Sequence, residues 1–333
     1  MSRLESKLSG PKLYVKRDDL TGVALGGNKI RQLDYILVEA KKRHCDYVIT
    51  TCGIQSNWSR QTVAFGSKMG MKALLVLRTA QFKNRPRVLD GNLLLDHIMG
   101  AEIKILRMKI NEDPAETLQA EARRLREDGH NPIVLGLAEG ISPLATVAYV
   151  DAASELTEQA DAINVKLNAI VLATGVGATQ AGLVLGTKIL GLKTKIVGIN
   201  VGAFSNEIIV NNIITSGNAA AKLLNSHVRL THDDIIITDK YAGKGYGITT
   251  KESVAAIYSA AKAEALILDP VYTSKAMAGL IDMVRTGEFG KDERVCFLHT
   301  GGIPALFAYK EHFQPIATKT GHVKRSRGKP VHA

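Results

Sequence analysis

The chain has 333 residues, of which 45% are hydrophobic, 5% aromatic and 23% charged, and its formal net charge is +11. This length suits two globular domains, and the shortage of aromatic residues argues against a β-sandwich and favours helices packed on sheets. No apolar run is long enough to cross a bilayer, the first residues carry no secretion signal, and three cysteines without metal-ligand spacing argue against disulfides and zinc. We therefore expect a cytoplasmic protein with no membrane partner and no metal.

Short apolar runs alternate with helical patterns along most of the chain. We predict strands at residues 47–51, 73–77, 103–106, 132–136, 169–173, 195–201 and 295–299. Apolar residues three and four apart predict helices at residues 29–43, 59–69, 114–128 and 142–159. Several strands lack alternation, as strands buried on both faces should. The pattern predicts an α/β fold of mostly parallel sheets with helices on both faces.

The first chemical segment is a charged strand, KRDD at residues 16–19, that runs into the glycine turn before Lys29. Four charges in one strand are costly unless they pair or serve a site. Lys29 stands where a helix should begin, and the positive end of the helix dipole lowers the pKa of its amine. A less protonated amine is a better nucleophile toward a carbonyl. An ordinary surface lysine in a turn is the alternative.

The second segment, residues 52–61, directly follows the strand predicted at residues 47–51 and contains Gln55, Ser56 and Asn57. Ser56 and Asn57 are good helix N-caps, which is the structural explanation for them. The functional explanation is that ligands of open α/β folds bind at the carboxyl ends of parallel strands. The segment alone leaves both explanations open.

The third segment, residues 172–183, reads strand, glycine turn and helix, with Gly175, Gly177 and Thr179 in the turn. Backbone amides of such a turn, with a helix dipole behind them, bind a phosphate group. Gln180 stands where a dinucleotide fingerprint needs its third glycine, and no acidic residue follows about 20 positions on. The turn therefore predicts one terminal phosphate, and packing glycines are the alternative.

Hydroxyl-rich loops follow the later strands. They contain Tyr246, Tyr272, Thr273 and Thr300. Each loop alone could be an ordinary turn. Together with the lysine turn and the phosphate turn, they describe a site for pyridoxal phosphate, in which the lysine holds the aldehyde and the polar loops hold the ring and a substrate carboxylate.

The last segment is a basic tail. Five of the positive charges lie in it, at Lys319, Lys324, Arg325, Arg327 and Lys329, and without them the net charge is +6. A solvated terminus explains such a tail. A non-catalytic nucleic-acid-binding protein is the alternative that the charge suggests, but no recognition motif supports it, so we expect no nucleic-acid partner.

The segments VKRDDLTGVALGGNKIRQL, GIQSN, TGVGATQAGL, GKGYG, DPVYTSKAMAGLIDMVRTGEF and HTGGIPALFAY occur in the order and spacing of a known family. From about residue 13 to residue 309 the chain resembles the D-cysteine desulfhydrases and 1-aminocyclopropane-1-carboxylate deaminases, which are tryptophan-synthase-β-like (fold type II) enzymes. The resemblance implies two three-layer α/β domains with pyridoxal 5'-phosphate in the cleft between them, and a homodimer. The large domain would hold residues 1–34 and 145–333, with a flexible tail from about residue 319, and the small domain residues 35–144.

The resemblance also implies roles for individual residues. Lys29 would be the Schiff-base lysine that later moves a proton at the substrate Cα, and Asn57 would donate to the cofactor's phenolic oxygen. The phosphate would lie against Gly175, Val176, Gly177, Ala178 and Thr179. The two active-site tyrosines would be Tyr246 and Tyr272. The substrate would lie beside Gln55, Ser56, Asn57 and Trp58, with Ser56 as a contact to its carboxylate or as a catalytic proton carrier.

Two positions separate the branches of the family. Aminocyclopropane deaminases carry Glu where this chain has Thr273 and Leu where it has Thr300, whereas D-cysteine desulfhydrases carry hydroxyl residues at both. A carboxylate at the pyridine nitrogen keeps it protonated, which opening a cyclopropane requires, while a hydroxyl suffices for β-elimination. We therefore expect a small amino-acid substrate, D-cysteine or a similar one, converted to pyruvate, ammonia and sulfide. An aminocyclopropane deaminase and a cysteate sulfo-lyase are the alternatives.

Two further positions depart from the family pattern. Trp58 replaces a smaller or polar residue and could reshape the substrate pocket, and Gln32 replaces a basic residue, which predicts a weaker phosphate contact.

Overall fold

The strands form two separate sheets, and every strand pairing in the described part of the chain is parallel. The structure, a computed structural model, describes residues 1–79, 88–109, 112–135 and 142–313. The five-stranded sheet has the order β1 (Lys12–Arg17), β9 (Arg294–His299), β6 (Ala169–Thr174), β7 (Lys195–Asn200) and β8 (Ile236–Thr238). The four-stranded sheet has the order β4 (Glu102–Leu106), β3 (Lys72–Arg78), β2 (Tyr47–Gly53) and β5 (Pro132–Leu135).

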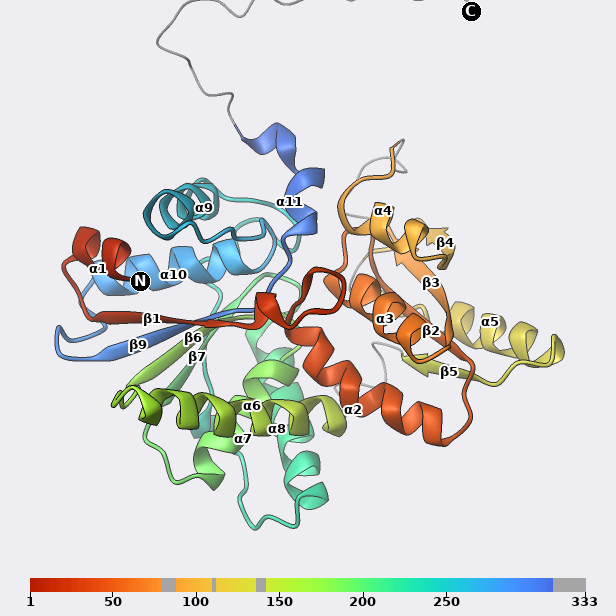
Figure 1. Ribbon diagram of the computed structural model, residues 1–333, viewed down its shortest axis with the longest axis horizontal. Coiled ribbons are helices and arrows are strands. Elements are labelled where there is room, and N and C mark those ends of the chain that lie inside the picture. Colours follow the sequence, from red (N-terminus) through yellow and green to blue (C-terminus); the bar gives the residue numbers. More distant parts are fainter. Residues whose placement is uncertain (80–87, 110–111, 136–141, 314–333) are drawn as a thin grey trace, which may run out of the picture.

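Helices cover both faces of the five-stranded sheet (Figure 1). One face packs against α1 (Ser2–Leu8), α9 (Lys251–Glu264) and α10 (Thr273–Arg285). The other face packs against α6 (Pro143–Ala162), α7 (Ala178–Ile189) and α8 (Asn206–Leu223). Because both faces are covered, all six residues of β6 are buried, which explains why its sequence is apolar without alternation.

The four-stranded sheet is also covered on both faces. The larger apolar cluster packs it against α2 (Asn28–Lys42), α3 (Asn57–Lys68) and α4 (Gly91–Ile98), and a smaller cluster packs the opposite face against α5 (Ala115–Glu127). The short helix α11 (Pro304–Ala308) lies beside α4 (Figure 1). No helix in the described part of the chain is long and apolar enough to cross a membrane.

The charged strand at the N-terminus pairs its charges. Lys16 contacts Glu155 on α6, Arg17 contacts Asp19 at 2.6 Å, and Asp18 accepts from Arg31 at 3.1 Å. Arg31 also contacts Glu155, at 2.7 Å. These ion pairs connect β1, α2 and α6, so the charges that looked costly in the sequence fix the start of α2.

The predicted α/β class with parallel sheets and covered faces is confirmed. The seven strands predicted between residues 47 and 299 are present, while the three-residue β8 was missed. Of the charged strand predicted at residues 16–19, Lys16 and Arg17 end β1, whereas Asp18 and Asp19 lie in a 3-10 helix. Of the strand predicted at residues 132–136, residue 136 lies outside the described residues, as does the tail from residue 319. The pairing of β1 with β9 places the N-terminal strand in the sheet of the C-terminal half. The division into domains stays a prediction.

Candidate active site

A cavity of about 410 Å³ lies where the carboxyl ends of strands from both sheets meet. Residues at or just after the ends of β2, β6, β7 and β9 line it. The predicted site residues that line it are Lys29, Asn57, Trp58, Gly175, Val176, Gly177, Ala178, Thr179, Tyr246, Tyr272 and Thr300. Segments far apart in the sequence therefore meet at one site, as the motifs predicted.

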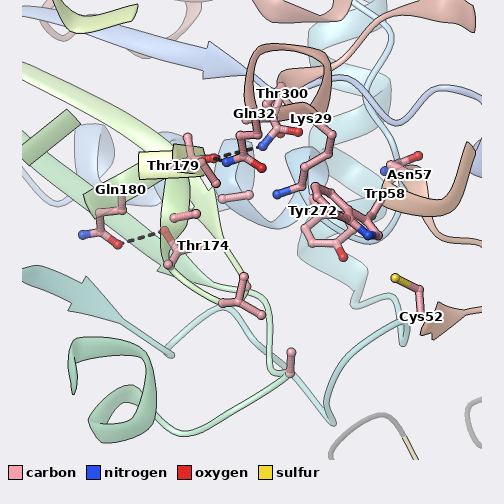
Figure 2. Close-up of a pocket in the computed structure, with 18 of the residues that line it drawn as sticks. Lys29, Gln32, Cys52, Asn57, Trp58, Thr174, Thr179, Gln180, Tyr272 and Thr300 are labelled. Carbon is pink, nitrogen blue, oxygen red and sulfur yellow. Dashed lines mark hydrogen bonds between the residues drawn. The ribbon is translucent and has the colours of Figure 1, made fainter. Parts of the chain in front are cut away.

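The turn before α2 directs Lys29 into this cavity (Figure 2). Gly27 has a φ of 132°, and a Cβ there would lie 2.5 Å from Nε2 of the buried Gln61. The Oε1 atom of Gln61 accepts from the backbone N–H of Ile30 at 3.0 Å, which satisfies one free donor at the helix start. The backbone N–H of Asn28 donates to the carbonyl of Thr300 at 3.1 Å. Gln61 and Thr300 thus hold the turn by hydrogen bonds, and only glycine fits at position 27, where the backbone contacts Gln61.

The environment of Lys29 makes its amine a nucleophile near neutral pH. Burial lowers the pKa of Lys29 from 10.5 to about 8, because a charged amine loses water contacts in the cavity wall. The prediction that the pKa of Lys29 is lowered is confirmed. The main cause of the lowering is burial of the amine, whereas from the sequence we expected the helix dipole to be the cause. At pH 8 about half of the amine is neutral and can attack a carbonyl.

The turn before α7 fits a phosphate group. Thr179 Oγ1 accepts hydrogen bonds from Asn28 Nδ2 at 3.0 Å and from Gln32 Nε2 at 3.2 Å (Figure 2). A hydroxyl has one proton to donate, so the proton of Thr179 is left for a further acceptor, and the cavity is where a phosphate oxygen would lie. The N-terminus of α7 adds backbone N–H groups and a favourable dipole. Gln32 departs from the family pattern, in which a basic residue stands at this position, but it still contributes to this site through its hydrogen bond to Thr179.

Asn57 has its amide fixed in one orientation. Its Oδ1 atom accepts from Asn92 Nδ2 at 2.9 Å and from Arg60 Nη1 at 3.5 Å. These contacts use the acceptor end of the carboxamide and leave the Nδ2 donor available to a ligand. A donor at this place fits the phenolic oxygen of pyridoxal phosphate.

Tyr246 and Tyr272 form a hydrogen-bonded pair in the cavity wall. Their hydroxyl oxygens are 2.6 Å apart, and their rings meet edge to face with centroids 5.7 Å apart. Burial raises the pKa of both phenols above the usual value of 10. Both therefore stay protonated at neutral pH; one hydroxyl donates to the other, which leaves one phenol proton for a ligand.

Trp58 presents carbon atoms to the cavity. Its indole N–H donates to Thr50 Oγ1 at 2.8 Å, and Thr50 in turn donates to the carbonyl of Leu135 at 2.7 Å. The ring lines the cavity while its polar atom is bound to the sheet. This departure from the family pattern makes an apolar wall.

Three predicted site residues do not line the cavity. Gln55 donates to the carbonyl of Asp90 at 2.9 Å and accepts from the backbone N–H of Asn92 at 2.8 Å. Ser56 caps α3 by accepting from Ser59 N at 3.2 Å. Thr273 donates to Asp269 Oδ1 at 2.6 Å, inside the protein. Their proposed roles beside the substrate and the ring stay predictions.

Sequence reasoning missed several residues of the site. Asn28 and Cys52 lie inside the motifs that we singled out, yet neither was assigned a role, and both line the cavity. Phe204 also lines it and follows the strand predicted at residues 195–201, so the rule that ligands bind after parallel strands could have found it.

Comparisons with known proteins agree with this geometry. Residues 1–301 match the family described as pyridoxal-phosphate dependent enzyme. A Pyrococcus furiosus protein provisionally named 1-aminocyclopropane-1-carboxylate deaminase is 40% identical, with 91% of this chain and 88% of the relative covered. The D-cysteine desulfhydrase of Serratia proteamaculans is 36% identical, with 93% and 92% covered.

A crystal structure of an ACC deaminase homologue superposes with a TM-score of 0.84 at 37% identity, covering 94% of this chain and 90% of that one. The fold type II architecture is thereby confirmed, and pyridoxal phosphate is the cofactor of the family. The chain belongs to the pyridoxal-phosphate-dependent enzymes, in the group that contains the D-cysteine desulfhydrases and the 1-aminocyclopropane-1-carboxylate deaminases.

Proposed function

We propose that the protein is a carbon–sulfur lyase that eliminates the β-substituent of D-cysteine, or of a similar amino acid, to give pyruvate, ammonia and sulfide. The observation that carries this proposal is the composition of the cavity wall. Lys29, with a pKa of about 8, lies among hydroxyl and amide groups, and no carboxylate lines the cavity within the described residues.

The residues divide the chemistry between them. Bound pyridoxal phosphate supplies an electron sink for the electrons released at the substrate Cα. The amine of Lys29 would hold the cofactor and, once the substrate has taken its place, would remove the Cα proton. The β-substituent then leaves with its bonding electron pair, and the resulting enamine hydrolyses to pyruvate and ammonia. The phenol pair of Tyr246 and Tyr272 keeps its protons at neutral pH; one proton joins the two hydroxyls, and the other is left to donate to the substrate side of the cavity.

The absence of a lining carboxylate among the described residues favours elimination over ring opening. A carboxylate at the ring nitrogen would keep that nitrogen protonated and deepen the electron sink. Thr300 supplies a hydroxyl at the cavity, and the hydroxyl of Thr273 is bound to Asp269. Elimination of a leaving group that departs with its bonding electron pair requires less electron withdrawal by the cofactor ring than opening an unactivated cyclopropane does.

Two other activities are the candidates to exclude. The Pyrococcus furiosus relative supports an aminocyclopropane deaminase. A cysteate sulfo-lyase must bind a sulfonate, but Lys29 is the one charged side chain among the described residues that line the cavity.

A panel of D- and L-amino acids tests the proposal. We expect pyruvate, ammonia and sulfide from D-cysteine, and little 2-oxobutyrate from aminocyclopropane carboxylate. Faster release of 2-oxobutyrate, or of sulfite from cysteate, would reject the D-cysteine assignment in favour of the corresponding alternative.

We further propose that the enzyme works as a homodimer in the cytoplasm, without nucleic acid. Large apolar side chains are exposed on the surface, with Leu20 67%, Leu25 59% and Phe307 62% accessible, and an interface would cover them. Light scattering on the purified holoenzyme measures the mass, and a monomer at micromolar concentration would contradict the dimer.

A further inference from the structure

Lys275 is a buried cation whose partners are all backbone carbonyls. It lies in the first turn of α10 and has no exposed surface. Its Nζ atom donates to the carbonyls of Val201 at 2.9 Å, Ala242 at 2.7 Å and Gly245 at 2.8 Å. An ammonium has three protons, so its donor capacity is filled.

No carboxylate of the described residues forms a salt bridge with Lys275. The nearest acidic residue in the sequence, Asp269, accepts from the backbone N–H groups of Val271, Tyr272 and Thr273 at the start of α10. Three carbonyl dipoles around one positive charge resemble the oxygen sites that hold potassium in proteins. Burial of the charge is tolerated because each proton has an oxygen partner.

The three carbonyls belong to the segments that position Tyr246. Val201 ends the β7 segment, and Ala242 and Gly245 bracket the turn just before Tyr246. The backbone N–H of Tyr246 donates to the carbonyl of Gly202 at 3.0 Å. Gly202 has a φ of 86°, and a Cβ there would lie 2.9 Å from the Cα of Gly245, so the two backbones touch. Lys275 binds next to this contact, because its ammonium donates to the carbonyls of Val201 and Gly245.

The same lysine lies three residues after Tyr272, the partner of Tyr246. Tyr272 precedes the first turn of α10, and Tyr246 is carried by the loop that the ammonium holds. A single side chain therefore connects the helix of one tyrosine to the loop of the other.

We propose that Lys275 is a positioning residue whose ammonium serves as the resident cation of a three-carbonyl site, and that this site sets the distance between the Tyr246 and Tyr272 hydroxyls. The inference does not depend on which substrate the enzyme takes. A hydrophobic residue of the same length would fill the space but would leave the carbonyls of Val201 and Ala242 without donors and that of Gly245 with only the backbone N–H of Ile248, at 3.3 Å.

Cation rescue of the holoenzyme tests the proposal. Lys275→Ala vacates the space, and potassium or methylammonium ions are then added at constant ionic strength against tetramethylammonium chloride, whose cation is too large. We expect kcat to fall about 100-fold in the variant, since misplacing a group by about 1 Å costs this much. Potassium or methylammonium should restore both Tm and kcat.

Two readouts do not need a substrate and so separate this inference from the proposed function. Added potassium should raise the Tm of Lys275→Ala and shift its near-ultraviolet tyrosine absorbance. The absorbance shift should disappear in the double variant with Tyr246→Phe, while the rise in Tm persists. Lys188→Ala, at a surface lysine that donates to a carbonyl and a carboxylate, should show neither effect.

Lys275→Met keeps the volume without the charge, and we expect it to lose activity that no cation restores. Wild-type activity and tyrosine absorbance in Lys275→Met would overturn the proposal. The proposal would also be overturned if Lys275→Ala folds but no cation changes its Tm or its kcat, or if neither variant folds in any of these salts. Folding of Lys275→Ala only with potassium or methylammonium would support it.

Discussion

The carboxamide nitrogen of Gln32 on α2 donates a hydrogen bond to Thr179 Oγ1 on α7, at 3.2 Å. Asn28 donates to the same oxygen at 3.0 Å. A neutral pair of donors thus stands where the family resemblance predicts a basic side chain, and we expect it to direct the proton of Thr179 toward a bound phosphate.

Gln32→Leu should weaken the binding of pyridoxal phosphate about fivefold, since one net hydrogen bond contributes about 1 kcal/mol. Titration of the apoenzyme with cofactor, followed by absorbance, gives the dissociation constant. Gln32→Lys is the matched control: a charge near the phosphate should tighten binding and make it more sensitive to salt. Equal affinity in Gln32→Leu and the wild type would contradict the role of Gln32.

Lys29→Ala should abolish both the absorbance band of the attached cofactor and pyruvate formation, because the variant has no amine to hold the aldehyde or to move the Cα proton. Circular dichroism checks that the variant folds, and Lys188→Ala controls for loss of a lysine elsewhere. Full pyruvate formation by Lys29→Ala would reject Lys29 as the catalytic lysine.

The rate at which the apoenzyme attaches its cofactor should rise with pH and level off above about pH 8, because the neutral amine of Lys29 is the nucleophile and its pKa is lowered to about 8. Stopped-flow absorbance measures the rate at each pH. A rate that keeps rising toward the ordinary lysine pKa of 10.5 would show that burial does not lower it.

Trp58→Ala should enlarge the substrate side of the cavity and raise activity toward S-alkyl cysteines relative to cysteine. Trp58→Phe keeps an apolar wall and loses only the hydrogen bond to Thr50, so its substrate preference should match the wild type while its stability falls by about 1 kcal/mol. The measurement is the ratio of kcat/KM for S-alkyl cysteines to that for cysteine, in each variant and in the wild type. An unchanged ratio in Trp58→Ala would place the substrate away from Trp58.

Asp96→Asn should gain stability relative to the wild type as the pH rises. Asp96 is fully buried on α4, and burial raises its pKa from 3.8 to about 8. The folded state therefore binds a proton that the unfolded state has released, so wild-type stability falls between about pH 4 and about pH 8. Thermal melts of both proteins across this range test the sign. A constant difference in Tm would mean that Asp96 is not held protonated.

The order of elements was predictable because buried parallel strands carry a local signal. The strand predicted at residues 169–173 is β6 (Ala169–Thr174), and the helix predicted at residues 29–43 is α2 (Asn28–Lys42). The edge strand β8 pairs along three residues with β7, and such a short run has too few apolar positions to stand out.

The motifs predicted which segments meet at the cavity, but they could not predict where each side chain points. Gln55 turns toward Asp90 and Asn92, which lie more than thirty residues later and leave no mark on its local sequence. Lys275 gave one unused signal, a charge next to the apolar residues that follow it in α10, and its three partners come from two distant loops.

Helix α2 contacts elements of both sheets. Its first turn is bound to Thr179 and Thr300 and is tied to α6 by Arg31, while its later residues pack on the four-stranded sheet. The first turn of α2 and Thr179 are thus tied together, whereas Asn57 and Trp58 begin α3, which packs on the four-stranded sheet. If the two predicted domains move apart during catalysis, we expect products to leave past Trp58 while Lys29 keeps the cofactor, so that the enzyme need not rebind it in each catalytic cycle.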